Sequence, residues 1–300
     1  MKLVTMCVPD GGKERETIGA VLGGDRVLDL AGASAAIPPD MILFLEGGRP
    51  LLEMAAALCR EAEGGRHAAH VRPLAAVRLR APVPRPRKFL HTGVNFPAHL
   101  KEANRKPPAQ VPGAPRFSST IIGPDEPVVY PSITQQLDAE AEIAIVIGTR
   151  CKNVPPDRAL DVIAGYTLYN DITARDIQRD EKRGGVFLAK NLDTTNPIGP
   201  WIVTSDEIPD PEDMEIVGRV DGRELQRNST QNMIFGIREL IAYYSQMTLE
   251  PGDLISTGTC EGCGIFRKPD PTPFLLKVGS VAEVASRQIG VLRNPVVAER

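Results

Sequence analysis

One segment, Asp138-Ala-Glu-Ala-Glu-Ile-Ala-Ile-Val-Ile-Gly148, constrains the fold of this chain more than any other. Its apolar half, residues 143–147, is too rich in β-branched residues to favour a helix, and a glycine ends it. We therefore predict a strand here. Because side chains alternate along a strand, Asp138, Glu140 and Glu142 are expected to share one face.

Neighbouring carboxylates that lead into a buried strand repel each other unless a cation or a proton lies between them. One interpretation is a solvated strand end with a fringe of acids, and the other is a metal site. The later segment 166–178 favours the metal, because it has the pattern of a strand, a turn and a short polar helix, with Asp171 at the strand end. Three oxygen ligands with no histidine or cysteine nearby would select Mg²⁺, Mn²⁺ or Ca²⁺ rather than zinc.

Turn-forming residues set the expected fold class. The chain has 27 glycines and 27 prolines among its 300 residues, which exceeds the roughly 12% of an average protein. From Lys88 onward, short apolar runs alternate with Gly, Pro and Asp turns, so we predict a mostly β fold with some α. Prolines 82, 84 and 86 favour an extended connector. We place a domain boundary there, between a small N-terminal α+β domain (1–80) and a larger domain (81–300).

Composition excludes several classes of function. With 35 Lys+Arg against 38 Asp+Glu, the chain lacks the basic field of a nucleic-acid binder. No apolar run approaches the roughly 18 residues of a membrane span, and no signal-peptide core is evident. Five scattered cysteines argue against a disulfide framework. We expect a cytoplasmic protein that binds neither nucleic acid nor membrane.

Two further features carry candidate chemistry. In Asn95-Phe-Pro-Ala-His-Leu-Lys-Glu102, the proline suits the first turn of a helix, which would place His99 and Glu102 on one face. An imidazole oriented by a carboxylate is a plausible general base, although such pairs are also common on surfaces. Lys190 interrupts an apolar stretch, and it either extends to solvent or faces an anionic substrate.

Six motifs in order resemble the fumarylacetoacetate hydrolase superfamily over residues 88–297. They are Gly93-Val-Asn-Phe-Pro-Ala-His99, Asp138-Ala-Glu-Ala-Glu142, Tyr169-Asn-Asp-Ile-Thr-Ala-Arg-Asp176, Ala189-Lys-Asn-Leu-Asp-Thr194, Asn196-Pro-Ile-Gly-Pro-Trp201 and Thr257-Gly-Thr-Cys-Glu-Gly-Cys-Gly264. The resemblance implies a mixed β-sandwich roll around a divalent-metal site, in a homodimer, with a small N-terminal unit. Together the motifs are specific for the superfamily and far less specific for a substrate.

The resemblance also implies roles for individual residues. The metal ligands would be Glu140, Glu142 and Asp171, with Mg²⁺ or Mn²⁺ as the cofactor and Ca²⁺ as a possible occupant in a crystal. The catalytic groups would be His99 and Glu102, on a lid that orders when substrate binds, and Lys190 against the charged oxygens of the substrate. The further substrate contacts would be Arg175, Gln178, Thr259 and Arg116.

The chain departs from the family pattern at several positions. Phe96 replaces a usual tyrosine, and His91 stands where a small or apolar residue is usual. Cys260 and Cys263 form a C-x-x-C by substitution into the glycine-rich loop around Thr259. Without a second pair or clustered histidines, a zinc or redox role for these cysteines is not expected.

The leading hypothesis is a metal-dependent hydrolase that cleaves a carbon–carbon bond in a β-diketo acid resembling an acylpyruvate. A water activated by the His–Glu pair would attack, and a pyruvate-type enolate would leave. The same scaffold supports hydratases, isomerases and decarboxylases of 2-oxo-dicarboxylates from aromatic catabolism. A non-catalytic metal- or metabolite-binding homologue and a cysteine-based redox protein are the rival classes.

Overall fold

The computed structural model describes residues 1–299, with Asp10 described by its backbone alone. Most of its strands lie in one mixed sheet with the order β4-β3-β2-β1-β14-β12-β11-β17-β6-β7, to which β5 adds beside β1 and β8 beside β14. These twelve strands are β1 (Lys2–Asp10), β2 (Lys13–Leu22), β3 (Arg26–Asp29), β4 (Val71–Pro73), β5 (Arg78–Leu79), β6 (Phe89–Thr92), β7 (Gly113–Arg116), β8 (Ile121–Ile122), β11 (Ala141–Ile147), β12 (Ile163–Asn170), β14 (Asn196–Thr204) and β17 (Leu254–Ser256).

A second, five-stranded sheet packs against the first, and a two-stranded ribbon lies beside the site described below. The five strands run in the order β16-β15-β18-β19-β9, and the ribbon pairs β10 with β13. Their bounds are β9 (Val128–Tyr130), β15 (Glu215–Val220), β16 (Arg223–Ser229), β18 (Val281–Ser286), β19 (Gly290–Ala298), β10 (Leu137–Asp138) and β13 (Thr173–Ala174). The expected mixed β fold with some α is therefore confirmed.

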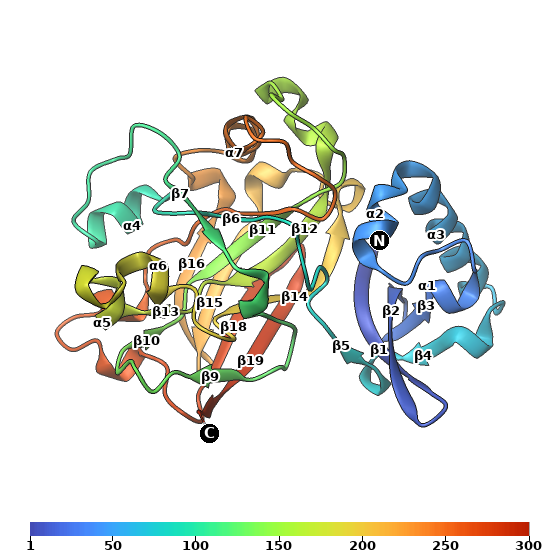
Figure 1. The fold of residues 1–300 in the computed structure, drawn as a ribbon, viewed down its shortest axis with the longest axis horizontal. Helices are drawn as coiled ribbons and strands as arrows, with labels where there is room; N and C mark the ends of the chain where they lie inside the picture. The colour runs from blue at the N-terminus through green and yellow to red at the C-terminus, as the bar shows by residue number, and fades with distance from the viewer. Residues whose placement is uncertain (300) are drawn as a thin grey trace.

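The α-helices lie around the sheets and are short, except for the 16-residue α3. They are α1 (Leu30–Ala33), α2 (Met41–Glu46), α3 (Gly48–Glu63), α4 (Pro97–Glu102), α5 (Arg175–Gln178), α6 (Gly185–Ala189) and α7 (Ile237–Tyr244). Figure 1 shows α1–α3 packed with the blue N-terminal strands, whereas α4–α6 lie at the other end of the molecule. No helix among residues 1–299 has the length and apolar character needed to cross a membrane.

Strand β11 is buried on both faces, which explains its nearly continuous apolar sequence. Ile143 and Ile145 on one face join a core that includes strands of the second sheet and α7. Ala144 and Val146 on the other face join a core shared with the N-terminal strands and helices. The sheet is therefore continuous across the boundary expected near residue 80, where β1 pairs with β14 (Figure 1); that boundary stays a prediction.

Candidate active site

Pairing of β11 with β12 brings together the acids that are distant in the sequence. Glu142 lies opposite Tyr169 in the antiparallel register, and Asp171 directly follows β12. The backbone N–H of Asp171 donates to the carbonyl of Glu140 over 2.9 Å, which closes the pairing at its end. Glu140, Glu142 and Asp171 are all buried, so this strand end is not a solvated fringe of acids.

Buried cations surround Asp171. The Arg116 guanidinium donates to both of its carboxylate oxygens, at 3.3 and 3.2 Å, and the Tyr169 hydroxyl donates at 2.7 Å. The Lys190 ammonium also donates to Asp171 and bonds to Oε2 of Glu140 and Oγ1 of Thr173, each at 2.7 Å. Lys190 therefore lies in the interior and bridges two of the acids, and it does not extend to solvent.

Arg175 forms ion pairs with two further carboxylate oxygens, one of them on Glu140. Its Nη2 lies 2.7 Å from Oε1 of Glu140 and 2.9 Å from Oδ2 of Asp138. Its Nη1 donates to the side-chain oxygen of Gln178 over 3.0 Å, which fixes Gln178 at the site. Asp138, which belongs to β10, therefore orients the arginine that it shares with Glu140.

The formal charges at the site nearly balance. Four buried carboxylates, Asp138, Glu140, Glu142 and Asp171, face three buried cations, Arg116, Arg175 and Lys190, which leaves one negative charge. Burial acts to raise the pKa of Asp171, but Arg116 and Lys190 outweigh it, so that pKa falls well below its usual value. Arg175 and Lys190 likewise outweigh burial and lower the pKa of Glu140. These two carboxylates are therefore ionised at neutral pH.

Glu142 differs from the other acids. Burial raises its pKa well above the ordinary value, and the charges of Asp171 and Glu140 add to the rise. Its Oε2 accepts from the backbone N–H of Gly258 over 3.1 Å, whereas Oε1 is buried without a hydrogen-bond partner among the described residues. A buried carboxylate oxygen without a partner is costly, and a bound cation would satisfy it. The donor set therefore fits a divalent cation.

A backbone feature maintains the contact of Glu142 with Gly258. Gly258 has φ +80°, and a Cβ at this position would lie 2.4 Å from the carbonyl oxygen of Gly93. Only glycine adopts this positive φ without strain and leaves room for the Gly93 carbonyl. The glycine loop that follows β17 can therefore approach the carboxylate closely.

His91 is a neighbour that sequence reasoning did not assign to the site. Its Nδ1 lies 3.3 Å from Oδ2 of Asp171 and 4.0 Å from Oε1 of Glu142. Burial lowers the pKa of His91 well below its usual value, and the charges of Arg116 and Lys190 contribute. The ring is therefore neutral at neutral pH. The expectation of an oxygen cluster with no histidine or cysteine nearby was wrong, because strand pairing brings β6 to this site and a loop brings Cys263 close to Glu140.

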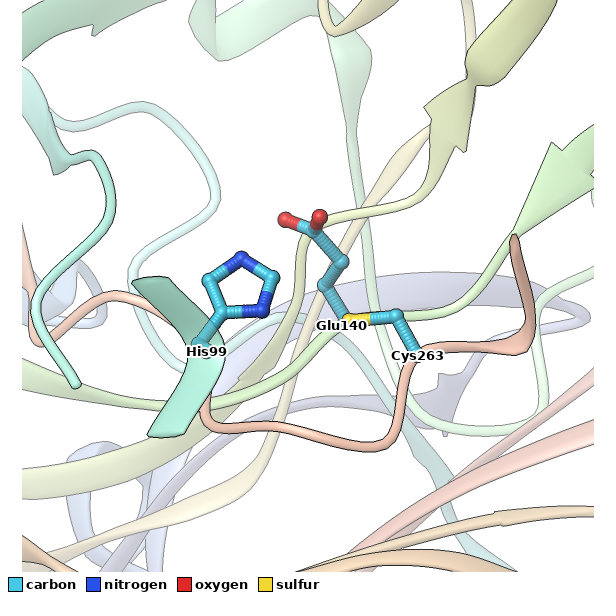
Figure 2. A group of neighbouring side chains, drawn as sticks. All are labelled: His99, Glu140 and Cys263. Carbon is cyan, nitrogen blue, oxygen red and sulfur yellow. The ribbon is translucent and has the colours of Figure 1, made fainter. Parts of the chain in front are cut away.

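His99 and Glu102 form a hydrogen-bonded pair on α4, with Nδ1 and Oε1 2.7 Å apart. Glu102 is held in turn by the backbone N–H of Gly262, at 3.1 and 2.9 Å from its two oxygens. Figure 2 shows the His99 ring beside the carboxylate of Glu140, with Cys263 reaching the same place from a later loop. Ligand atoms of these three residues lie within 4.8 Å of one another, and His99 is buried. The His99–Glu102 pair therefore lies at the acid cluster.

The glycine-rich loop is anchored by a glutamine from the second sheet. The side-chain amide of Gln226 donates to Oγ1 of Thr259 and to the carbonyl of Cys260, each over 2.8 Å. Thr259 itself donates to the carbonyl of Ala141 over 3.1 Å. Burial raises the pKa of the Cys260 and Cys263 thiols, so both are neutral and occupy the loop as packing groups.

A cavity of about 340 Å³ lies over these groups. Of the residues that the sequence assigned to the site, His99, Glu140, Glu142, Arg175, Gln178, Lys190 and Thr259 line it. Glu102 lies behind His99, and Asp171 lies below, in contact with Lys190. Arg116 holds Asp171 and is not among the residues that line the cavity, so the structure gives it a different partner from the substrate anion expected.

Reasoning from the sequence did not find His91, Tyr169, Gln226 and Phe266 as site residues. The substitution to histidine at position 91 was a visible departure from the pattern, but its contact with Asp171 depends on the order of strands in the sheet. Gln226 is a polar residue in a hairpin strand and has no local signal of function. Phe266 packs edge-on against His99, with ring centres 5.6 Å apart.

The fold and the site define a protein class: a mixed β-sheet protein with a buried carboxylate cluster suited to a divalent cation and a His–Glu pair beside it. Residues 88–297 match the family model described as fumarylacetoacetate (FAA) hydrolase C-terminal. The chain belongs to the fumarylacetoacetate hydrolase family, as its motifs indicated.

Relatives of known name cover almost all of the chain. Oxaloacetate tautomerase fahd2, mitochondrial, from Xenopus laevis is 36% identical over 91% of this chain and 83% of its own length. The human oxaloacetate tautomerase FAHD2A, mitochondrial, is 37% identical over 91% of this chain and 85% of its own length.

Solved structures match over the full length of both chains. A putative HpcE protein from Mycobacterium smegmatis superposes with a TM-score of 0.83 at 32% identity. Maleylpyruvate hydrolase from Sphingobium sp. SYK-6, in complex with manganese(II) and pyruvate, gives a TM-score of 0.77 at 31% identity. The relatives thus include tautomerases and a hydrolase, and the hydrolase was solved in complex with manganese(II).

Proposed function

We propose that this chain is a divalent-cation-dependent enzyme that interconverts the keto and enol forms of a small 2-oxo-dicarboxylate such as oxaloacetate. The observation that carries the proposal is the His99–Glu102 pair, which places an oriented imidazole beside Glu140 in the cavity that the acids and cations line. The relatives that cover 91% of the chain at 36–37% identity are named for this reaction. Their names move the preference away from hydrolysis, which the sequence alone had favoured.

The charges at the site support a dianionic substrate. One formal negative charge remains among the buried groups, and a bound divalent cation would turn this into one positive charge. Arg175 and Lys190 line the cavity, and the loop after α4 adds Arg105 and Lys106. A carboxylate at each end of a small substrate can therefore meet a cationic group.

Glu140, Glu142 and Asp171 would hold the cation, Mg²⁺ or Mn²⁺, which when bound would polarise the keto group of the substrate as a Lewis acid. His99 accepts a proton at Nε2 from the carbon next to the keto group, and the electron pair of that C–H bond moves toward the keto oxygen. The ammonium of Lys190 stabilises the negative charge that develops on the oxygen. His99 then returns the proton to the oxygen, which completes the enol. Glu102 stabilises the imidazolium through Nδ1–H in the interval.

A second candidate is the hydrolysis of a carbon–carbon bond in a β-diketo acid resembling an acylpyruvate. The full-length similarity to maleylpyruvate hydrolase favours it. Here His99 would take a proton from a water that attacks the distal carbonyl, and the bond between that carbon and the enolate carbon would break. Both candidates need the same enolate, so the same residues serve both reactions.

The product distribution distinguishes these candidates. The purified protein is given oxaloacetate and, separately, a panel of acylpyruvates, with Mg²⁺ or Mn²⁺ and with a chelator, and the products are followed by proton NMR and enol absorbance. Faster keto–enol exchange than with the same metal alone, without new products, supports the tautomerase. Pyruvate plus a second acid supports the hydrolase, and CO₂ release indicates decarboxylation. If no substrate reacts, the chain is a binding homologue and the proposal is wrong.

The oligomeric state and location of the protein stay predictions of the sequence. The expected homodimer is tested by size-exclusion chromatography with light scattering, in which a mass of about 65 kDa would be twice the 32.5 kDa chain. The expected cytoplasmic location is tested by fractionation of the source cells.

A further inference from the structure

Strand β6 carries a histidine into the floor of the cavity. His91 is buried on β6, which pairs in parallel with β17, and β17 pairs with β11, the strand of Glu142. Three strands of one sheet therefore fix the distance between the imidazole and the acids. His91 also lines the cavity, so its ring faces the space in which a ligand would bind.

Donor atoms of His91, Glu142 and Asp171 all lie within 4.8 Å of one another, and all three residues are buried. We propose that Nδ1 of His91 is a further ligand of the divalent cation, added to the carboxylates of Glu140, Glu142 and Asp171. This rests on the cation of the proposed function but not on the reaction that the enzyme catalyses.

The hydrogen-bond partners of these atoms leave room for a metal ligand role. Oε1 of Glu142, which faces His91 at 4.0 Å, has no hydrogen-bond partner among the described residues. Nδ1 of His91 has Oγ of Ser256 at 3.3 Å, which is longer than the usual range for hydrogen bonds of about 2.7–3.2 Å. A histidine with a purely structural role would be expected to make a shorter bond. Instead, Nδ1 of His91 and Oε1 of Glu142, which has no hydrogen-bond partner among the described residues, lie 4.0 Å apart. A cation could bind both atoms.

An imidazole ligand changes which metals the site prefers. Carboxylate oxygens alone suit Mg²⁺ and Ca²⁺, whereas a nitrogen ligand suits later divalent metals, whose affinity rises from Mn²⁺ through Fe²⁺ and Co²⁺. His91 would therefore favour Mn²⁺ and its neighbours over Mg²⁺ at this centre. Asp171 would remain oriented by Arg116, which holds it from the side away from the cavity.

The test uses Mn²⁺ bound to the metal-free, full-length protein without substrate, so failure of the proposed reaction cannot affect it. Pulsed electron paramagnetic resonance detects a nitrogen nucleus bound directly to Mn²⁺. We expect this ¹⁴N signal in the wild type and in His67→Gln, a control at a histidine in the N-terminal region, and its loss in His91→Gln. Absence of the signal in the wild type overturns the proposal. Retention in His91→Gln together with loss in His99→Gln overturns it as well, because His99 would then be the ligand.

A second measurement covers the case in which the variant binds metal weakly or folds poorly. Competition with a metal-sensitive dye gives the affinity of each protein for Mn²⁺ and Mg²⁺, and circular dichroism confirms folding. We expect His91→Gln to lose Mn²⁺ affinity by about 10- to 100-fold, the amount that even outer-sphere partners of metal ligands contribute. Mg²⁺ affinity should fall much less. An equal loss for both metals, or no loss for Mn²⁺, would contradict a nitrogen ligand.

Discussion

The Nζ of Lys190 lies 2.7 Å from Oε2 of Glu140, and both residues are buried. The same ammonium contacts Asp171, so one lysine compensates two carboxylates. Replacing it with methionine leaves buried acids short of a cation, which typically costs about 3–5 kcal/mol. We expect Lys190→Met to lower the free energy of unfolding of the metal-free protein by that order in urea titrations. Lys190→Arg, which keeps the charge, should lose much less, and equal losses would show that the charge is not what stabilises the site.

The His99–Glu102 pair should be needed for turnover but not for the fold. His99→Asn removes the base, and general acid–base catalysis contributes about 10²- to 10⁴-fold to a rate. We expect kcat to fall within that range, with a smaller fall for Glu102→Gln, which weakens the orientation of the ring. The matched control is Lys101→Ala, an exposed position on the same helix. Wild-type kcat in His99→Asn would exclude the pair from the chemistry.

Glu142 makes the stability of the metal-free protein depend on pH. Burial, with the charges of Asp171 and Glu140, raises its pKa above the ordinary 4.5, so folding favours the protonated form. Its stabilising contribution is therefore full below about pH 4.5 and is lost as the pH rises through the raised value. Glu142→Gln does not titrate, and in the presence of a chelator it should melt higher than the wild type at pH 7 by a few degrees.

The difference in melting temperature between Glu142→Gln and wild type should grow from pH 4.5 toward neutrality in chelator. If this difference in melting temperature stayed constant across the pH range, ionisation of Glu142 would not destabilise the metal-free protein, and the prediction would be wrong. Adding Mn²⁺ should reverse the order, because only the wild type has the carboxylate for the cation.

The C-x-x-C of the glycine loop should be inert in the native protein. Burial raises the pKa of the Cys260 and Cys263 thiols above the ordinary 9.0, and both residues are 0% exposed. Thiolates are the reactive form, so iodoacetamide at pH 8 should leave both residues unmodified until the protein is unfolded, as peptide mass spectrometry would show. Rapid native alkylation at either residue, with parallel loss of activity, would revive the cysteine-based alternative.

Local patterns in the sequence predicted the elements that carry the site. The β-branched run after Glu142 forms β11, and Pro97 begins α4 with His99 and Glu102 on one face, because these features depend on neighbours in the chain. The Asp-Gly pair at 221–222 predicts a hairpin, and β15 and β16 do pair across this turn. The helical spacing of apolar residues over 233–246 predicts a longer helix than the one observed, because Met233 is extended and α7 spans only Ile237–Tyr244.

Contacts between side chains that are distant in the sequence could not be predicted from local patterns. Arg116 and Asp171 are 55 residues apart, and Gln226 meets Thr259 from another sheet. Their contacts follow from strand order and not from any spacing along the chain. His91 is the clearest case: it differs visibly from the family pattern, yet its position beside Asp171 requires β17 to lie between β6 and β11.

The pairing of β1 with β14 also covers an edge of the main sheet. Lys2 and Leu3 take up the backbone groups of Val203 and Ile202. A fragment that started at residue 88 would leave that part of β14 as a bare edge, and bare edges recruit strands from other molecules. The first eighty residues thus cover this edge, and we expect a fragment that lacks them to aggregate at a lower concentration than the full chain.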